Sequence, residues 1–278
     1  MDRPLENSPV PPPPVFDVRG LVYRYDRVLA LDGVSLIVRP GESIALLGAN
    51  GSGKSTLLRL LDGLYFPESG SIHFLGQPLT AGRLEDEAFS FAFRRKVGMV
   101  FQNPDVQLFN PTVFDEIAFG PLQMQWPRET IRQRVAATLE SLDIAHLRDR
   151  APHRLSGGEK KRVAIASVLV LDPEVLLLDE PTAALDPHSH DHVVDLLSGW
   201  RGTGKTVLTA THDLETVEEI ADRCIVFRAG HVAAWGPPAQ ILDDTNLLRE
   251  TGLLHAHRHT HASGETHSHP HRHHPDVP

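Results

Sequence analysis

The residues best suited to chemistry lie in a glycine-rich segment, Gly48-Ala49-Asn50-Gly51-Ser52-Gly53-Lys54-Ser55. In such a loop, glycines let backbone N–H groups point inward around phosphates, and the helix that follows adds partial positive charge. The lysine reaches the β- and γ-phosphates, and the next hydroxyl ligates Mg²⁺. An ordinary glycine-rich turn is the alternative, and the strand-to-helix context argues against it. The pattern predicts a nucleotide site formed by Gly48, Asn50, Gly51, Ser52, Gly53, Lys54, Ser55 and Thr56.

Two acids follow the apolar run Val175–Leu178. A carboxylate at the end of a buried strand can hold Mg²⁺ through water, which suits Asp179. Glu180 can orient or deprotonate an attacking water. Two acids after a strand are more often a solvated strand end. Their position downstream of a phosphate loop favours the catalytic interpretation.

A second helix start with phosphate-binding character is Leu155-Ser156-Gly157-Gly158-Glu159. Its exposed N–H groups could hold another phosphate. The alternative is an ordinary capping box, in which Ser156 caps the helix and Glu159 reaches back. Both can hold, because capping and phosphate binding use the same N–H groups. The chain therefore has more phosphate donors than one nucleotide needs.

Several elements must position these residues. Buried strands are expected at Ser43–Leu47, Val97–Phe101, Val175–Leu178 and Thr206–Thr209, and a helix at Lys54–Leu61. Short strands from Val15 to about Val38 would turn at Asp26–Arg27 and Asp32–Gly33, and Glu129–Leu147 has helical periodicity. Cys224–Phe227 and His231–Trp235 are expected to form a hairpin that turns at Ala229–Gly230.

Composition limits the function classes. The 278 residues carry a net charge of −9, which argues against general binding to nucleic acid, so we expect no nucleic-acid partner. Cys224 is the single cysteine, which excludes an intrachain disulfide or a cysteine cage. No apolar run approaches the length of about twenty residues that a membrane span needs, and the start has no secretory-signal character. Work at a membrane would therefore require partner subunits.

With these motifs in order, the chain resembles the ATP-binding subunits of ABC transporters. Leu155–Glu159 resembles the signature motif, and Ala184-Leu185-Asp186 resembles the D-loop. By the same resemblance, Gln102 stands at the Q-loop position and His212 at the switch position. Tyr25 stands where the family has an aromatic residue that stacks on adenine, with Tyr23 the less favoured alternative. Taken singly, each of these three residues would more often be an ordinary packed or surface side chain.

The resemblance implies an α/β fold, with a P-loop NTPase (RecA-like) core, an antiparallel β subdomain and an inserted α-helical subdomain. We expect an extension at residues 1–15, the nucleotide-binding domain at 16–254 with its helical insertion at about 105–163, and a disordered tail at 255–278. In this family two such domains face each other head to tail, so a homodimer or a pair with another ABC ATPase is implied. ATP and Mg²⁺ are the implied cofactors. Catalytic roles are implied for Lys54, Gln102, Glu180 and His212, nucleotide contacts for Ser156, Gly157, Gly158 and Asp186, and Mg²⁺ ligation for Ser55, Gln102 and Asp179.

The stretch after Gln102 narrows the match. Val97–Pro104, Gln107–Phe109 and Phe114–Pro121 resemble the ATPases of energy-coupling-factor importers, particularly those for cobalt and nickel. The implied partners are a transmembrane coupling protein and a substrate-binding membrane protein, at the cytoplasmic face of the cell membrane. Phe109, Phe114 and Phe119 would line the partner surface, or simply pack in the core. Import of another micronutrient such as a vitamin, and a soluble non-transport ABC ATPase, remain the alternatives.

The end of the chain holds nine of the seventeen histidines. Neutral imidazole is a good ligand for Ni²⁺, Co²⁺, Zn²⁺ and Cu²⁺. Alternate spacing in an extended chain puts successive side chains on one side. A solvated disordered tail and a purification tag are the alternatives, and the irregular spacing argues against a tag. Metal binding is therefore a hypothesis for His255, His257, His259, His261, His267, His269, His271, His273 and His274.

Overall fold

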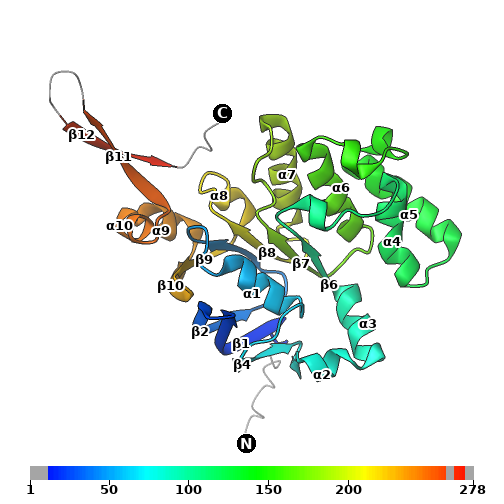
Figure 1. The fold of residues 1–278 in the computed structure, drawn as a ribbon, viewed down its shortest axis with the longest axis horizontal. Coiled ribbons are helices and arrows are strands. Elements are labelled where there is room, and N and C mark those ends of the chain that lie inside the picture. The colour runs from blue at the N-terminus through cyan, green and yellow to red at the C-terminus, as the bar shows by residue number, and fades with distance from the viewer. Residues whose placement is uncertain (1–11, 261–265, 273–278) are drawn as a thin grey trace, which may run out of the picture.

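The structure, a computed structural model, describes residues 12–260 and 266–272, and from residue 255 onward only the backbone is described. Its centre is a six-stranded sheet with the order β10-β9-β3-β8-β7-β6 (Figure 1). The inner pairs are parallel, and β10 alone runs antiparallel to its neighbour. The strands are β3 (Ser43–Leu47), β6 (Val97–Val100), β7 (Val175–Asp179), β8 (Thr206–Thr211), β9 (Arg223–Arg228) and β10 (His231–Gly236).

The central strands are buried on both faces, which explains why β3 and β7 are mostly apolar in the sequence and why β8 is rich in β-branched residues. Every residue of β3 is buried. Because side chains alternate across a strand, Ala45 and Leu47 belong to one apolar cluster while Ile44 and Leu46 belong to the other. The predicted parallel strands at β3, β6, β7 and β8 are confirmed, and so is the hairpin of β9 and β10 with its turn at Ala229–Gly230.

A second, antiparallel sheet lies beside helix α1 in the order β2-β1-β4-β5. Its strands are β1 (Phe16–Tyr25), β2 (Val28–Val38), β4 (Ser69–Phe74) and β5 (Gln77–Pro78). The turn at Asp26–Arg27 is confirmed. The turn expected at Asp32–Gly33 is wrong, because both residues lie inside β2. There the register with β1 shifts and Gly33 has φ 69°, the left-handed conformation that a β-bulge accommodates.

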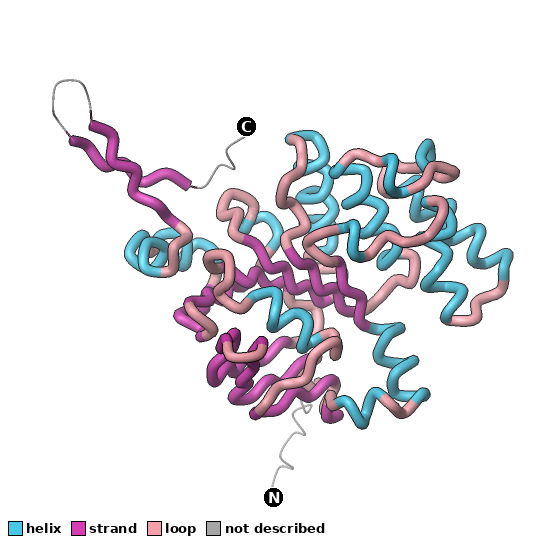
Figure 2. Tube along the Cα trace, viewed as in Figure 1, coloured by secondary structure: helices cyan, strands magenta, loops and turns pink. Residues whose placement is uncertain are grey.

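The helices form two groups around the central sheet. Helix α1 (Lys54–Leu61) and the antiparallel sheet cover one face, and the later helices cover the other, as Figures 1 and 2 show. Helices α2 (Ala81–Leu84) and α3 (Glu87–Lys96) lie between β5 and β6 in the chain. After β7 come α7 (Pro187–Trp200), α8 (Val217–Ile220), α9 (Pro238–Asp243) and α10 (Thr245–Glu250).

The segment between β6 and β7 is helical, as the sequence predicts, and none of its described residues forms a strand. It contains α4 (Val113–Gln123), α5 (Arg128–Ser141) and α6 (Gly157–Leu169), with 3-10 turns at Pro104–Val106, Ala145–Leu147 and Pro152–Arg154. The helix expected over Glu129–Leu147 is too long, because α5 ends at Ser141. Asp143 has φ 53°, and such a left-handed residue ends a helix.

After Leu253 the described backbone forms a hairpin. Strand β11 (Leu254–Thr260) pairs with β12 (Thr266–Arg272) in an antiparallel register (Figure 1). The predictions for residues 1–11 of the proline-rich extension, and for His261, His273 and His274, lie outside the described residues. Among the described residues, no helix combines the length and apolar character that crossing a membrane requires.

Candidate functional site

The glycine-rich loop connects β3 to α1 at the carboxyl edge of the parallel strands. Gly48 has φ 146° and Gly53 has φ 111°, which only glycine adopts without strain. A Cβ on Gly48 would lie 2.5 Å from the Phe227 carbonyl oxygen, and one on Gly53 would lie 2.8 Å from the Ala30 carbonyl oxygen. Two glycines of this loop are therefore required by conformation and by close backbone approach, and not only by a ligand.

The loop forms the floor of a pocket of about 350 Å³. Ten of the residues singled out in the sequence line it: Tyr25, Asn50, Gly51, Ser52, Gly53, Lys54, Ser55, Thr56, Gln102 and Glu180. Val28, Leu29 and Ala30 also line it and were missed. Val28 is 68 % exposed and Leu29 38 % exposed, although both are apolar. The sequence did contain a signal for these residues, because they are apolar and directly follow the Asp26–Arg27 turn. Apolar side chains can contact the flat face of a nucleotide base.

Tyr25 lies at the mouth of this pocket in a cluster of three tyrosines. Its ring makes edge contacts with Tyr23 and Tyr65, whose own rings stack with centroids 5.5 Å apart. The Tyr25 hydroxyl accepts hydrogen bonds from Thr56 Oγ1 at 3.4 Å and from Arg59 at 3.3 Å. Tyr23 lines no part of the described pocket, so the geometry favours Tyr25 as the stacking residue.

Ser55 and Asp179 meet at the head of α1, although 124 residues separate them in the sequence. Ser55 Oγ donates to Asp179 Oδ1 at 2.7 Å. The other carboxylate oxygen of Asp179, Oδ2, is buried and has no hydrogen-bond partner in the described part of the chain. Burial raises the pKa of this carboxyl, while the hydrogen bond from Ser55 opposes the shift. A hydroxyl beside an unpaired buried carboxylate oxygen is a donor set that fits Mg²⁺.

Glu180 directly follows β7 and is held in an unusual conformation. Its φ is 48°, a left-handed value that is rare for a residue with a long side chain and typical of functional sites. The side chain is buried: Oε2 bonds His212 Nδ1 at 2.9 Å, and Oε1 lies 3.7 Å from Lys54 Nζ. A carboxylate fixed between a histidine and a lysine, with one oxygen that has no hydrogen-bond partner among the described residues, can accept a proton from a bound water.

The charges of this cluster are coupled. The hydrogen bond to Glu180 raises the pKa of His212, which favours the imidazolium form. Burial lowers the pKa of Lys54, whose Nζ donates to the Gly48 carbonyl at 2.6 Å. A cation at this position faces the centre of the loop. It is suited to neutralise phosphate charge in a low-dielectric setting, where electrostatic interactions are strong.

Gln102 follows β6 and lines two hollows at once. One is the nucleotide pocket, and the other is a hollow of about 370 Å³ that Gly157, Ala184 and Leu185 also line. The side chain is exposed, so it can contact a group at either place. Asp186 directly follows Leu185 in the sequence. Its side chain caps α7 by accepting a hydrogen bond from the Ser189 N–H at 3.1 Å.

The signature segment forms the predicted capping box. Ser156 accepts from the Glu159 N–H, and Glu159 accepts from the Ser156 N–H at 2.7 Å. Ser156 and Gly157 are exposed, and neither lines the nucleotide pocket of the same chain. Gly158 is buried, and a Cβ there would lie 2.4 Å from Ser189 Oγ. Gly158 is therefore required for packing against α7, which the sequence did not indicate.

One chain thus holds two separate phosphate-binding features. Residues of the loop, Gln102 and Glu180 line one pocket. Asp179 is hydrogen-bonded to Ser55 of that pocket, and His212 is bonded to Glu180. The exposed start of α6 lies outside that pocket. This arrangement can bind a nucleoside triphosphate and activate a water molecule beside it. The start of α6 stays free to contact a second molecule.

Comparison with known proteins agrees with this geometry. The family model described as ABC transporter matches residues 31–183, which is more than half of the chain. The nickel import ATP-binding protein NikO of Rhodobacter capsulatus is 58 % identical over 244 residues, covering 87 % of this chain and 96 % of that protein. The nickel import ATP-binding protein LarO of Lactiplantibacillus plantarum is 47 % identical over 212 residues, covering 76 % of this chain and 88 % of that protein.

The fold agrees as well. The structure of CbiO1 from Clostridium perfringens, described as part of the ABC transporter complex CbiONQ, aligns with a TM-score of 0.72 and 39 % identity, covering 87 % of this chain and 95 % of that one. The α/β fold predicted from the motifs is confirmed. By family match, by sequence identity and by the nucleotide pocket itself, this chain belongs to the ABC transporter family, as one of its ATP-binding subunits.

Proposed function

We propose that this chain hydrolyses ATP to power the import of a divalent metal ion, nickel or cobalt, through transmembrane partner subunits. The observation that carries the choice of cargo is the 58 % identity to a nickel import ATP-binding protein, which covers nearly the whole of that protein. The complete pocket around Lys54 and Glu180 supports hydrolysis in this chain itself.

Within the pocket, we propose that Lys54 neutralises the phosphates and that Tyr25 stacks on the adenine. Ser55, Gln102 and Asp179 would hold Mg²⁺, which supplies charge neutralisation of the phosphates when it is bound. Glu180 accepts the proton of the attacking water, and His212 holds Glu180 in place through its 2.9 Å hydrogen bond.

The active assembly is a pair of chains, preferably two copies of this one. Ser156 and Gly157 are exposed at the start of α6, where backbone N–H groups favour a phosphate. Gly158 supports that start by packing on Ser189, and Asp186 caps the adjacent helix. A related cassette, MJ0796, is described as a dimer in a post-hydrolysis state bound to ADP and Pi, which supports a paired arrangement.

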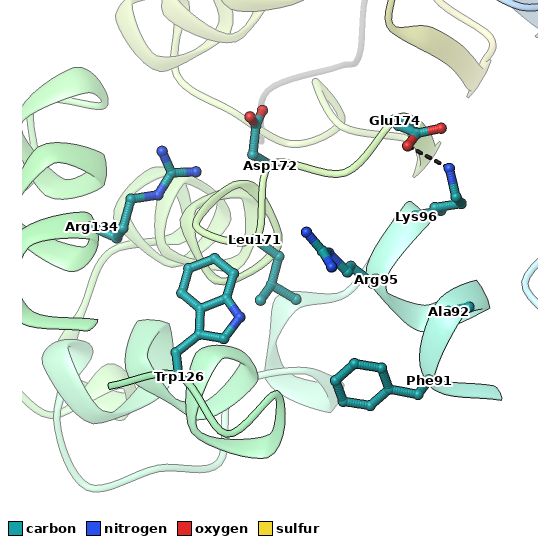
Figure 3. Close-up of a pocket in the computed structure, with 9 residues that line it drawn as sticks. All are labelled: Phe91, Ala92, Arg95, Lys96, Trp126, Arg134, Leu171, Asp172 and Glu174. Atoms are coloured by element: carbon teal, nitrogen blue, oxygen red, sulfur yellow. Dashed lines mark hydrogen bonds and ion pairs between the residues drawn. The ribbon is translucent and has the colours of Figure 1, made fainter. Parts of the chain in front are cut away.

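A groove between α3 and the helical segment is the surface that we assign to the transmembrane coupling protein. It has a volume of about 570 Å³ (Figure 3). Phe91, Trp126 and Leu171 give it apolar surface, and its charged groups are of both signs: Arg95, Lys96, Arg134, Asp172 and Glu174. Such a mixed lining suits an amphipathic helix. The chain would therefore work at the cytoplasmic face of the cell membrane, bound to a coupling protein and a substrate-binding membrane protein.

The three phenylalanines expected at the partner surface divide into two kinds. Phe109 is 68 % exposed and Phe119 38 % exposed, and their rings meet edge to face at 5.0 Å. Phe114 packs partly against the core and lies under Arg148. We propose that the Phe109–Phe119 pair contributes to the partner surface and that Phe114 is a packing residue.

The histidine-rich tail adds a second proposed metal site, which would bind and buffer Ni²⁺ or Co²⁺. The register of β11 and β12 places His255 opposite His271, His257 opposite His269 and His259 opposite His267. Because positions alternate between the faces of a strand, these six positions lie on one face of the hairpin. Calorimetric titration of Ni²⁺ into the full chain and into a chain ending at Leu254 tests this site. Equal binding by both would rule it out.

Transport measures the proposed function as a whole. The chain would be co-purified with its membrane partners and reconstituted in vesicles with ATP enclosed in the lumen, where inward-facing copies of this chain can use it. We expect accumulation of radioactive Ni²⁺ or Co²⁺ that disappears in Glu180→Gln. ATP-dependent accumulation of another solute, such as a vitamin, without either metal would overturn the proposed cargo and leave the ATPase role intact.

A further inference from the structure

One buried cation in this chain has no place in the roles assigned above. Lys161 lies in the second turn of α6, and only 2 % of its surface is exposed. Lysine is almost never fully buried unless it is paired. No carboxylate lies within ion-pair distance of its ammonium in the part of the chain that the structure describes. Burial lowers the pKa of Lys161 to about 8, although Asp179 and Glu180 oppose the shift. Keeping this ammonium in the interior is therefore costly.

The partners of Lys161 are main-chain carbonyls. Its Nζ donates to the Gln102 carbonyl at 2.6 Å, to the Glu180 carbonyl at 3.2 Å and to the Phe101 carbonyl at 3.4 Å. An ammonium has three protons to donate, so the three acceptors account for all of them. Main-chain acceptors indicate that the side chain fixes the path of the backbone at these residues.

The three acceptors belong to two catalytic segments that the sequence keeps far apart. Gln102 follows β6 and Glu180 follows β7, and these strands are parallel neighbours, so their ends lie side by side. Lys161 itself stands on α6, five residues after Ser156. One side chain thus joins the Q-loop, the catalytic carboxylate and the signature helix.

The main chain of Glu180 is held on both sides. Its N–H donates to the Ala210 carbonyl at 2.9 Å, and its carbonyl accepts from Lys161 at 3.2 Å and from the Ala183 N–H at 3.3 Å. This matters because Glu180 has a left-handed φ of 48°, which persists only where surrounding contacts enforce it. Losing the lysine would remove the one side-chain restraint among the three hydrogen bonds that hold this strained main chain, and the carboxylate could then shift.

The Q-loop is fastened to α6 in the same way. Gln107 Oε1 accepts from the Phe101 N–H at 3.1 Å, and Gln107 Nε2 donates to the Ala164 carbonyl at 2.8 Å. The peptide groups around Phe101 are therefore tied to α6 by two side chains, Gln107 and Lys161. A movement of α6 would be transmitted to Gln102 and to Glu180 together.

We propose that Lys161 is a positioning residue for ATP hydrolysis, which holds Glu180 and Gln102 in register with the signature end of α6. The inference rests on the proposed roles of Glu180 and Gln102. Lys161 does not touch the nucleotide pocket, and it acts through the two residues whose carbonyls it binds. It makes the start of α6, which is presented to a second chain, rigid with respect to the water-activating carboxylate.

The test compares Lys161→Met with Lys160→Met. Methionine keeps nearly the length of the lysine side chain and removes its hydrogen-bond donors. Lys160 is the adjacent residue, and its Nζ pairs with the exposed Asp105 at 2.7 Å. For Lys161→Met we expect kcat for ATP to fall about 10- to 100-fold, as for a small misplacement of a catalytic group. KM for ATP should stay within about threefold, because the phosphate loop is untouched. Lys160→Met should keep wild-type kcat.

A double-mutant cycle with Glu180→Gln separates positioning from a general loss of packing. Because Lys161 acts in part through Glu180, Lys161→Met should lower the residual turnover of Glu180→Gln by a smaller factor than it lowers that of wild type. Additive effects would overturn the inference, and so would unchanged kcat in folded Lys161→Met. Should Lys161→Met fail to fold, Lys161→Leu, which also removes the donors, is measured by the same criteria. Normal turnover by Glu180→Gln alone would instead overturn the proposed role of Glu180.

Discussion

At the scale of single residues, the chemistry depends on how Glu180 is held. Its buried carboxylate contacts His212 and lies close to Lys54, and its backbone is in a left-handed conformation. Each of these contacts involves a residue from a different part of the chain. The protein therefore supports one carboxylate from several directions, as expected of a group that must meet a water at a defined angle.

Replacing Glu180 separates binding from hydrolysis. Glu180→Gln keeps the size of the side chain and removes its basicity, so we expect ATP to bind while kcat falls on the order of 100-fold or more. Phosphate release and binding of a fluorescent ATP analogue measure the two steps. Glu68→Gln, at an exposed carboxylate, is the control and should behave as wild type. Normal turnover in Glu180→Gln would remove Glu180 from the catalytic role.

The His212–Glu180 pair makes stability depend on pH. The folded pKa of His212 is raised above its ordinary value of 6.5 by the hydrogen bond to Glu180. A raised folded pKa contributes stability that is fully present below the unfolded pKa and is lost as the pH rises through the folded pKa. We therefore expect the difference in Tm between wild type and His212→Gln to be largest near pH 6 and to shrink above it.

Melting curves recorded between about pH 6 and pH 9 test this expectation. The control is His153→Gln, at an exposed position in a 3-10 turn. A Tm difference for His212→Gln that stays constant across this range would contradict the assignment of the pair.

At the scale of elements, α6 and α7 meet at Gly158. A Cβ on Gly158 would lie 2.4 Å from Ser189 Oγ, whereas one on Gly157 would meet nothing within 4 Å. We expect Gly158→Ala to lower the free energy of unfolding by about 1–3 kcal/mol, as overpacking does. Gly157→Ala should change it by less than about 1 kcal/mol. Chemical denaturation measures both.

A second substitution checks the cause of this difference. Ser189→Gly removes the colliding side chain, so adding it to Gly158→Ala should restore part of the lost stability. Equal stability of the two glycine variants would contradict the contact, and so would a failure of Ser189→Gly to rescue Gly158→Ala.

The elements that the sequence predicted well are those with a local signal. Strands β3 and β7 are mostly apolar and β8 is rich in β-branched residues because both of their faces are buried, and the loop before α1 has a fixed spacing. The bulge at Gly33 and the end of α5 at Asp143 were missed, because each depends on a left-handed residue whose tertiary context decides between a turn and a bulge.

The site was predicted to the same extent and for the same reason. Lys54, Asp179 and Glu180 belong to motifs with fixed neighbours, whereas Val28 and Leu29 have no motif and enter the pocket only through the pairing of β1 and β2. Lys161 stands in a run of basic residues that resembles a solvated helix face. Its burial follows from three carbonyls that come together only in the folded chain, and no local pattern announces it.

At the scale of the whole molecule, the account depends on a nucleotide site that two chains share. Ser156 and Gly157 lie outside the pocket that holds Lys54 and Glu180 in the same chain. A nucleotide pocket and a separate, exposed helix start on one chain fit a closed dimer that ATP holds together and that hydrolysis releases. Import would then use this opening and closing through the partner surface.

The mass of the Glu180→Gln protein in solution tests this claim most directly, by light scattering with and without MgATP. The account predicts a dimer only with MgATP, and a monomer when Ser156→Arg is added, although that double variant should still bind ATP. A dimer that persists in the double variant would contradict the shared site, and so would loss of ATP binding by a chain whose own pocket is unchanged.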